Sequence, residues 1–257
     1  QTLQTPFYST IGHKVPLTPR DYFLVLGDTL IETTSWSDQS AFTGFYYRDL
    51  FVDCFRKGAG WISMPLATHN PEYIDEMDDV IPNNEPMIDA PNLTLFNDTV
   101  FVSDHGSNNQ LGIDWIKRHF PQYNYVHMSK EHFVGHLDAH FNILGPGKIL
   151  TWHPKEHFPD YFKNWTFIQL DKSYDAMKSG VQQLLDGRVQ DDDFANTILS
   201  ANSLVIDQNT LMMSDEYKDT DLGMIKEIEN HGIDIAWAPY RYQHFFNHGI
   251  TCITLEL

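Results

Sequence analysis

Short apolar runs occur in pairs along this chain, and a tight turn of Gly, Asp, Asn or Pro separates the two runs of each pair. The four pairs are FLVLGDTLIETT from Phe23, LTLFNDTVFVSD from Leu93, FNILGPGKILTW from Phe141 and SLVIDQNTLMMSD from Ser203. Apolar and β-branched residues on both sides of such a turn are typical of a β-hairpin. The pattern therefore predicts four hairpins.

Between the hairpins, apolar residues recur at spacings of three and four, which predicts amphipathic helices. The expected helices are Phe42–Lys57, Asn109–His119, Tyr174–Leu185 and Leu222–Asn230. Each repeat also has one more short strand candidate, at Gly60–Met64, Tyr123–Met128, Trp165–Leu170 and Ile233–Ala238. The last seven residues, TCITLEL, are expected to form a further strand. The chain thus repeats a unit of roughly ββαβ, with strand before helix in the third copy.

Repeated sheets that each bury one face favour a closed radial arrangement. We therefore expect an α/β propeller of ββαβ repeats, in a single domain over residues 1–257, with an incomplete first or fifth repeat. An open, doubly wound parallel sheet is the alternative. Neither G-x-G-x-x-G nor G-x-x-x-x-G-K-[ST] follows a predicted strand, so no nucleotide-binding motif supports that alternative.

The composition argues against several classes of partner and of protein. The 257 residues carry 17 Lys and Arg against 35 Asp and Glu, a net charge of −18 that would repel nucleic acid and anionic membranes. Apolar runs reach about six residues, too short to span a membrane, and the polar start QTLQTPFYST shows no secretory signal. Cys54 and Cys252 are too few for a disulfide framework. We expect a cytoplasmic protein that acts on small molecules.

Chemically versatile residues stand just before the hairpins, at positions that a propeller would bring to one end of its axis. They are Asp21, Asp89, His136 with Asp138, Asn196, and Cys252 in the expected last strand. Carboxylates bind a planar cation such as guanidinium through paired, charge-assisted hydrogen bonds. A thiol can attack the central carbon of that cation while a histidine moves protons. The set therefore suits covalent chemistry on a guanidino group.

The segment GHLDAHFNILGPG (Gly135–Gly147) resembles the arginine:glycine amidinotransferase family of the pentein superfamily. LGIDWIKRHF (Leu111–Phe120) and the G-x-x-C that ends at Cys252 match the same family. Further support comes from TPRDYFLVLGDTLIETTSW (Thr18–Trp36), MIDA (Met87–Ala90) and LSANSLVID (Leu199–Asp207). The resemblance covers almost the whole chain.

This resemblance implies roles for the residues named above. Cys252 would be the nucleophile, His136 the general acid/base and Asp89 its carboxylate partner, while Asp21 and Asp138 would bind the guanidinium group. The amidino group of L-arginine would pass to Cys252 with release of ornithine, and then to a glycine-like amine acceptor. The resemblance implies neither a metal nor an organic cofactor.

The sequence also departs from the family pattern. Lys155 replaces an arginine that grips the donor carboxylate, exchanging a rigid fork for a point charge. Ala195 and Asn196 replace a serine pair near the bound amino acid, and Leu255 replaces a second cysteine. The family's first β-module and much of its C-terminal tail have no counterpart in the sequence, so we expect a propeller that is incomplete or is completed by a second chain in a homodimer.

Three alternatives stay open at this point. Water as acceptor would give a deiminase or dihydrolase of the same superfamily. A catalytically silent pentein acting as a binding module would have no need of Cys252. His136 and His140, four residues apart, raise the question of a metal site, but they lie in a predicted strand or loop and no H-E-x-x-H occurs. We therefore expect no metal ligand there.

Overall fold

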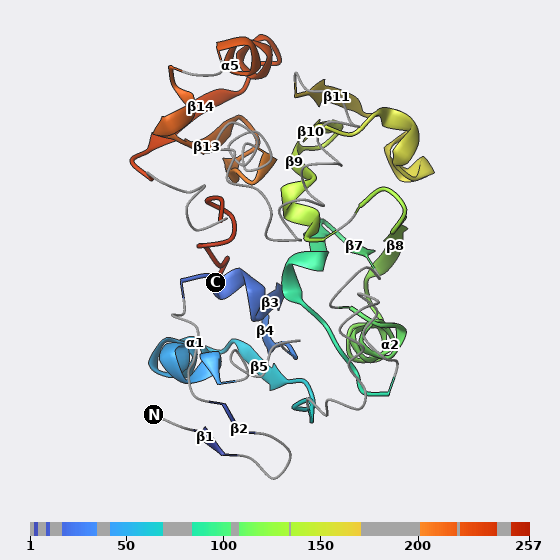
Figure 1. Cartoon of the computed structure of the whole chain (residues 1–257), viewed down its shortest axis with the longest axis vertical. Helices are drawn as coiled ribbons and strands as arrows, with labels where there is room; N and C mark the ends of the chain where they lie inside the picture. Colours follow the sequence, from blue (N-terminus) through green and yellow to red (C-terminus); the bar gives the residue numbers. More distant parts are fainter. Residues whose placement is uncertain are drawn as a thin grey trace. The chain divides into compact units, whose positions relative to one another are not determined.

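The computed structural model describes residues 3–4, 9–10, 17–34, 42–68, 84–103, 108–133, 135–170, 201–219, 222–240 and 248–257. The chain divides into two compact units (Figure 1). Unit 1 comprises Gln1–Gly135 with Thr254–Leu257, and unit 2 comprises His136–Ile253. The chain therefore changes unit twice, before His136 and after Ile253. The single domain expected over residues 1–257 stays a prediction.

Each unit contains two three-stranded sheets of the same construction (Figure 1). A hairpin forms two antiparallel strands, and the third strand pairs in parallel with the second strand of the hairpin. The strands of unit 1 are β3 (Phe23–Leu26), β4 (Thr29–Glu32), β5 (Gly60–Ser63), β6 (Leu93–Phe96), β7 (Thr99–Ser103) and β8 (Asn124–Met128). Those of unit 2 are β9 (Phe141–Gly145), β10 (Lys148–Thr151), β11 (Thr166–Gln169), β12 (Leu204–Asp207), β13 (Thr210–Ser214) and β14 (Asp234–Ala238). The four predicted hairpins and their third strands are confirmed.

Turn chemistry explains why the hairpins close where they do. Leu26 pairs with Thr29 across Gly27-Asp28, and Phe96 pairs with Thr99 across Asn97-Asp98. Gly27 (φ +63°) and Asn97 (φ 54°) have left-handed backbone conformations, which Gly adopts freely and Asn tolerates. A short pairing of β1 (Leu3–Gln4) with β2 (Ser9–Thr10) is a further sheet in unit 1 that the apolar pattern did not predict.

Three of the four predicted amphipathic stretches contain a helix in the structure. These helices are α1 (Arg48–Arg56), α2 (Gln110–His119) and α5 (Leu222–Asn230). The first was expected from Phe42, but its first turns form the 3-10 helix η3 (Thr43–Tyr47) instead. The expected helix Tyr174–Leu185 lies outside the described residues. In the third repeat, two 3-10 turns, η7 (Lys155–His157) and η8 (Asp160–Phe162), connect β10 to β11.

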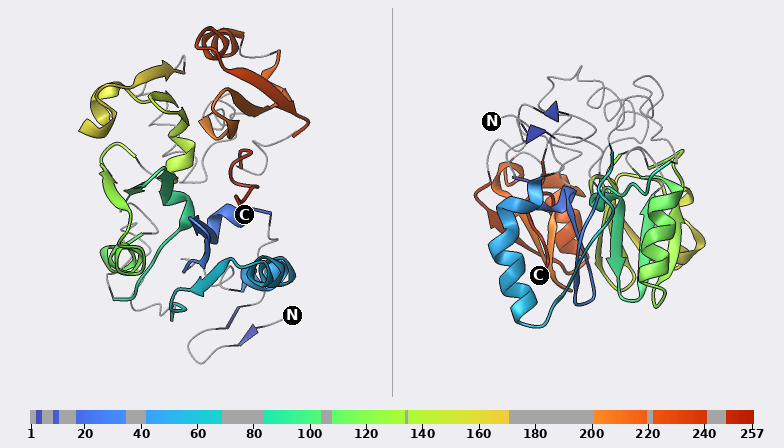
Figure 2. Two further views of the ribbon diagram at one scale, coloured as in Figure 1. Left: turned by 180° about the vertical axis from the view of Figure 1, so that it is seen from behind. Right: turned by 90° about the horizontal axis from the view of Figure 1, so that it is seen from below.

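Unit 1 has its main core between α2 and the hairpin strands, and α2 lies along β7 and β8 (Figure 2). Ile113 and Ile116 of the helix pack against Val100 and Val102 of β7. The amide of Asn109 caps the helix by accepting a hydrogen bond from Gly112 N at 2.9 Å. The four packed side chains of α2 and β7 are at most 1% exposed, so their burial stabilises unit 1.

Unit 1 also has a smaller aromatic core, formed by Tyr22, Phe23, Leu30 and Phe51. The core of unit 2 consists largely of buried side chains from its two sheets and from α5, and it includes Leu150, Trp152, Ile168, Leu211, Met213 and Ile228. Each unit therefore buries an apolar cluster of its own. Among the described residues, no helix combines the length and the apolar character that crossing a membrane requires.

A single 3-10 turn stands directly before the first strand of three hairpins. These turns are η1 (Pro19–Asp21) before β3, η5 (Ala90–Asn92) before β6 and η6 (Leu137–Ala139) before β9. The apolar pattern did not predict them, because three residues are too few to show a helical period. The turns matter because they carry or adjoin the candidate site residues.

The expected C-terminal strand TCITLEL is wrong. Residues 250–253 form a turn and 254–257 have no regular structure. The backbone N–H groups of Ile250 and Thr251 donate to the Asn202 carbonyl, so they do not join a strand. Leu255 packs against the aromatic core of unit 1, so an apolar side chain occupies the position where the resemblance implies a second cysteine.

Candidate active site

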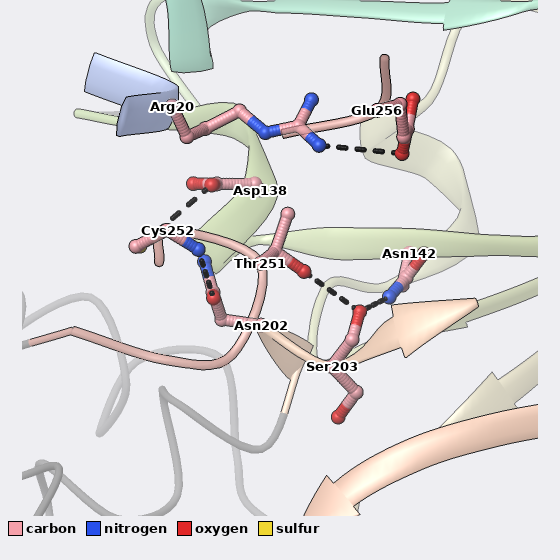
Figure 3. A network of polar contacts seen from close by, with 8 residues as sticks. All are labelled: Arg20, Asp138, Asn142, Asn202, Ser203, Thr251, Cys252 and Glu256. Carbon is pink, nitrogen blue, oxygen red and sulfur yellow. Dashed lines mark hydrogen bonds and ion pairs between the residues drawn. The ribbon is translucent and has the colours of Figure 1, made fainter. Parts of the chain in front are cut away.

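Cys252 lies in the turn near the C-terminus and is 5% exposed. Its Sγ donates a hydrogen bond to Asp138 Oδ2 over 3.8 Å (Figure 3). Asp138 belongs to η6, directly before β9, and is half-buried. Two of the residues predicted from the sequence, 114 positions apart, therefore meet in unit 2. A carboxylate beside a thiol is a place where a cation can bind next to a nucleophile.

The backbone around Cys252 is tied to the segment that leads into β12 (Figure 3). Cys252 N donates to Asn202 Oδ1 at 3.2 Å, and Ile250 N donates to the Asn202 carbonyl at 3.1 Å. Thr251 Oγ1 donates to the Ser203 carbonyl at 2.8 Å, which also accepts a hydrogen bond from Asn142 Nδ2. Asn202 lies within LSANSLVID, but nothing local in the sequence links it to a residue fifty positions away.

His136 is the residue that begins the η6 turn, two positions before Asp138. Its carbonyl accepts a hydrogen bond from Ala139 N at 3.1 Å, and its side chain is half-buried. The backbone thus holds His136 and Asp138 on one short turn. That turn supplies a group able to exchange protons and a group able to bind a cation.

Tyr240 is a further residue of this region that sequence reasoning missed. Burial raises the pKa of Tyr240, and the neighbouring charges of Cys252 and Glu216 raise it further. Its backbone is fixed, since Ser214 Oγ donates to the Tyr240 carbonyl at 2.5 Å. A tyrosine that follows a strand without a motif around it offers no signal in a single sequence. It remains a neutral phenol over the ordinary pH range.

Asp89 lies in unit 1, directly before η5, and is 2% exposed. Its backbone N donates to Asn108 Oδ1 at 2.6 Å, while Asn108 Nδ2 donates to the Ser103 carbonyl at 2.9 Å. The Asp89 carbonyl accepts a hydrogen bond from Asn92 N, which closes the turn. The chain therefore holds this buried carboxylate through its backbone.

Asp21 ends η1, and Thr18 Oγ1 donates to its Oδ2 at 2.7 Å. Burial raises the pKa of the nearby Tyr47, and the charges of Tyr22 and Asp21 contribute to the same shift. The turns η1 and η5 contact each other within unit 1. Two of the predicted carboxylates, Asp21 and Asp89, thus stand on or beside adjoining turns.

Of the two remaining predicted residues, Lys155 and Asn196, the structure describes only Lys155. Lys155 is exposed on η7, with its Nζ 5.4 Å from the centre of the Phe167 ring. This cation–π contact holds the ammonium group at the surface of unit 2. Asn196, with Ala195 beside it, lies outside the described residues.

His140, one of the two histidines considered for a metal site, lies beside another histidine. His140 Nδ1 lies 2.7 Å from His153 Nε2, and both side chains are buried, at 1% and 0% exposure. His140 therefore engages another histidine within unit 2. Over the described ranges, no group of three or more His, Cys, Asp or Glu side chains is arranged to hold a metal ion.

Sequence comparison finds amidinotransferases. Inosamine-phosphate amidinotransferase 1 of Streptomyces glaucescens is 24% identical over 264 residues, which cover 98% of this chain and 70% of that protein. The mitochondrial glycine amidinotransferase of Xenopus tropicalis is 32% identical over 187 residues, which cover 64% of this chain and 44% of that protein. No protein-family model matches the chain.

Comparison with solved structures gives the fold. SxtG, an amidinotransferase of Microseira wollei from the saxitoxin biosynthetic pathway, matches with a TM-score of 0.82 at 22% identity, over 99% of this chain and 73% of that one. DDAH from Pseudomonas aeruginosa, solved with citrulline, matches with a TM-score of 0.61 at 12% identity, over 93% and 74% of the two chains. The resemblance to amidinotransferases that the sequence motifs indicated is thus confirmed, and the chain has the pentein-type α/β fold of these proteins.

Proposed function

We propose that this protein is an amidinotransferase that moves the amidino group of L-arginine to an amine acceptor through a covalent intermediate on Cys252. The observation that carries the proposal is the hydrogen bond from Cys252 Sγ to the Asp138 carboxylate. A guanidinium group bound by that carboxylate would present its central carbon to the sulfur. The amidinotransferases among the sequence relatives support amidino transfer as the general chemistry.

The first half-reaction transfers the amidino group to the enzyme. Arginine binds with its guanidinium nitrogens donating to Asp138, which displaces the Cys252 S–H donor from that carboxylate. The thiol proton passes to His136, the sulfur attacks the guanidinium carbon and a C–S bond forms. The C–N bond to ornithine then breaks as His136 returns the proton to the leaving nitrogen. Ornithine leaves, and a cationic amidino-cysteine remains.

The second half-reaction is the same chemistry in reverse with a new amine. The acceptor amine attacks the amidino carbon, His136 takes the proton that the amine loses, and the C–S bond breaks. The proton returns to the Cys252 sulfur, and the guanidino product leaves. The net charge of −18 favours the approach of a cationic donor such as arginine.

Asp21 and Asp89 receive the roles that the resemblance implies, as a guanidinium ligand and as the carboxylate partner of His136. Lys155 and Asn196 are assigned to binding the amino-acid parts of the substrates. Lys155 suits a carboxylate as a point charge without the paired geometry of an arginine. These four assignments are tested by substitution, with the exposed Asp53 of α1 as a matched carboxylate control.

The decisive experiment is the mass of the intact protein after incubation with L-arginine alone. We expect a gain of one amidino group and release of one ornithine per chain. Cys252→Ser should abolish both, and Cys54→Ser, which alters a half-buried thiol on α1, should leave both unchanged. Absence of the adduct in the wild type at saturating arginine, or its persistence in Cys252→Ser, would overturn the proposal.

A hydrolase is the second candidate, because the fold is also that of DDAH and of an arginine dihydrolase from cyanobacteria. In the hydrolase reaction ammonia, not ornithine, would leave the guanidinium carbon after Cys252 attacks, and water would then attack the remaining adduct and release citrulline. Isotope-labelled arginine with and without glycine separates the two reactions. A transferase gives ornithine and a labelled guanidino product that depends on the amine, whereas citrulline formed without an amine indicates hydrolysis.

A further inference from the structure

We propose that Asn202 is a positioning residue that fixes Cys252 for attack. The proposal rests on the proposed function, in which Cys252 is the nucleophile. Asn202 is 2% exposed and stands two residues before β12. Because β12 pairs with β13 in the second sheet of unit 2, the segment that carries Asn202 is anchored to a sheet.

Asn202 holds the Cys252 turn through both its backbone and its side chain. Its carbonyl accepts from Ile250 N at 3.1 Å, and its Oδ1 accepts from Cys252 N at 3.2 Å. The second bond is made to the nucleophile's own backbone, one side-chain torsion away from the sulfur. Small displacements of a reacting group cost large factors in rate, so this bond lies where a positioning residue has its greatest effect.

Close packing against Gly249 fixes the amide from a second direction. A Cβ built on Gly249 would lie 2.3 Å from Asn202 Oδ1 and 2.6 Å from Asn202 Cγ. The side chain of Asn202 therefore occupies the space that any larger residue at position 249 would need. This contact gives a physical reason for the glycine in G-x-x-C, three residues before Cys252.

The Asn202 amide has only one orientation that satisfies its neighbour. Cys252 N–H is a donor, so the oxygen must face it, and Nδ2 points elsewhere. Within the described part of the chain, this buried Nδ2 has no hydrogen-bond partner. Asn202 Oδ1 is thus the atom of the amide that contacts the Cys252 turn. The acceptor oxygen is the part of the side chain that the site uses.

The test compares Asn202→Ala with Gly249→Ala, which disturb the same contact from its two sides. Both are expected to lower kcat by about 10-fold to 100-fold while KM changes little, since the loss falls on the position of the sulfur. Both should also speed the alkylation of Cys252 by iodoacetamide in the folded protein, because the turn becomes looser. Activities are referred to folded protein, measured by thermal unfolding.

Asn109→Ala is the matched control. Asn109 is also a buried asparagine whose Oδ1 accepts two backbone N–H groups, from Met87 and Gly112, but it lies in unit 1 at the start of α2. Its loss should lower stability and leave kcat per folded molecule unchanged. An equal fall of kcat in the control, a rise in KM at constant kcat, or wild-type kcat in both test variants would overturn the positioning role.

The outcome separates this proposal from the proposed function. If the wild type forms neither adduct nor product, amidino transfer fails, whereas the alkylation rates still report whether Asn202 holds the thiol. If the wild type is active and the alkylation rate and kcat of both test variants match it, positioning fails and amidino transfer stands.

Discussion

Asp89 in unit 1 and Cys252 in unit 2 are each held by a buried asparagine, but the two asparagines differ in how many of their amide atoms are hydrogen-bonded. In each, a buried asparagine accepts the backbone N–H of the candidate catalytic residue, Asn108 for Asp89 and Asn202 for Cys252. Asn108 uses both ends of its amide, because its Nδ2 donates to the Ser103 carbonyl. Within the described residues, Asn202 uses only its oxygen end. The difference lies in the asparagine amide: in unit 1 both of its ends are bonded, whereas in unit 2, over the part of the chain that the structure describes, only the end that accepts from Cys252 N is bonded.

The two units also differ in what surrounds a closely packed glycine near each candidate residue. In unit 1, a Cβ on Gly112 would meet the Met87 carbonyl oxygen at 2.1 Å, which is backbone two residues before Asp89. In unit 2, a Cβ on Gly249 would meet only the Asn202 side chain among its nearest atoms. A side chain can rotate away from a clash, but a capped helix and a bonded turn cannot separate easily. Replacing Gly112 in unit 1 by a larger residue should therefore destabilise the protein more than replacing Gly249 in unit 2.

The largest effect is expected for Gly112→Ala. Alanine favours a helix interior over glycine by about 1 kcal/mol, but overpacking against backbone should outweigh that gain and lower the free energy of unfolding by about 3 kcal/mol. Urea denaturation measures it. The comparison between the units breaks if Gly112→Ala is no more destabilising than Gly249→Ala.

A smaller loss of stability is expected for Asn108→Ala. This change leaves the Asp89 N–H and the Ser103 carbonyl without their partner, which should cost about 2 kcal/mol. Asn202→Ala removes one bond together with an unmet donor and should cost about 1 kcal/mol. Chemical denaturation of the two variants under identical conditions gives the ranking, and a reversed order would contradict it.

The smallest effect concerns two tyrosines. Burial, with a contribution from Tyr123, raises the pKa of Tyr125 in β8 of unit 1 to about 12. The pKa of Tyr240 is raised by burial and then by Cys252. Cys252→Ala should therefore lower the pKa of Tyr240 and leave that of Tyr125 unchanged. Alkaline titration of tyrosinate absorbance, with Tyr240→Phe and Tyr125→Phe to identify each signal, measures the shift.

The raised pKa of Tyr125 also has a consequence for stability. Its folded-state pKa lies above the ordinary value of 10.0, so the folded form keeps a proton that the unfolded chain loses. Its contribution is present below that value and is lost as pH rises toward about 12. Tyr125→Phe, which lacks the bond to the Phe120 carbonyl, should therefore be less stable near neutral pH and approach the wild type in strong alkali. A constant difference over that range would contradict this account.

Local chemistry explains which parts of the fold were predictable. The Gly27-Asp28 and Asn97-Asp98 turns close between short β-forming runs, so hairpin position follows from neighbours in sequence. The last seven residues show that the same logic can fail. Thr251 and Ile253 favour a strand by type, but the Asn202 carbonyl, about fifty residues earlier, takes the backbone donors of the turn.

The candidate site was predictable only in part for the same reason. His136, Asp138 and Cys252 were found through a motif that resembles known proteins, and the bond between Cys252 and Asp138 agrees with it. Asn202 and Tyr240 are connected to Cys252 by interactions between distant segments, for which one sequence carries no periodicity or spacing. Packing of the tertiary structure decides those contacts.

The 3-10 turns before three hairpins have an evolutionary consequence. Each turn is closed by its own backbone and is followed by a hairpin whose geometry depends on other residues. A mutation at one of the candidate site residues Asp21, Asp89 and Asp138 can therefore change a side chain of that repeat while its sheet stays intact. A fold built from repeats with such exchangeable positions can change its substrate one repeat at a time.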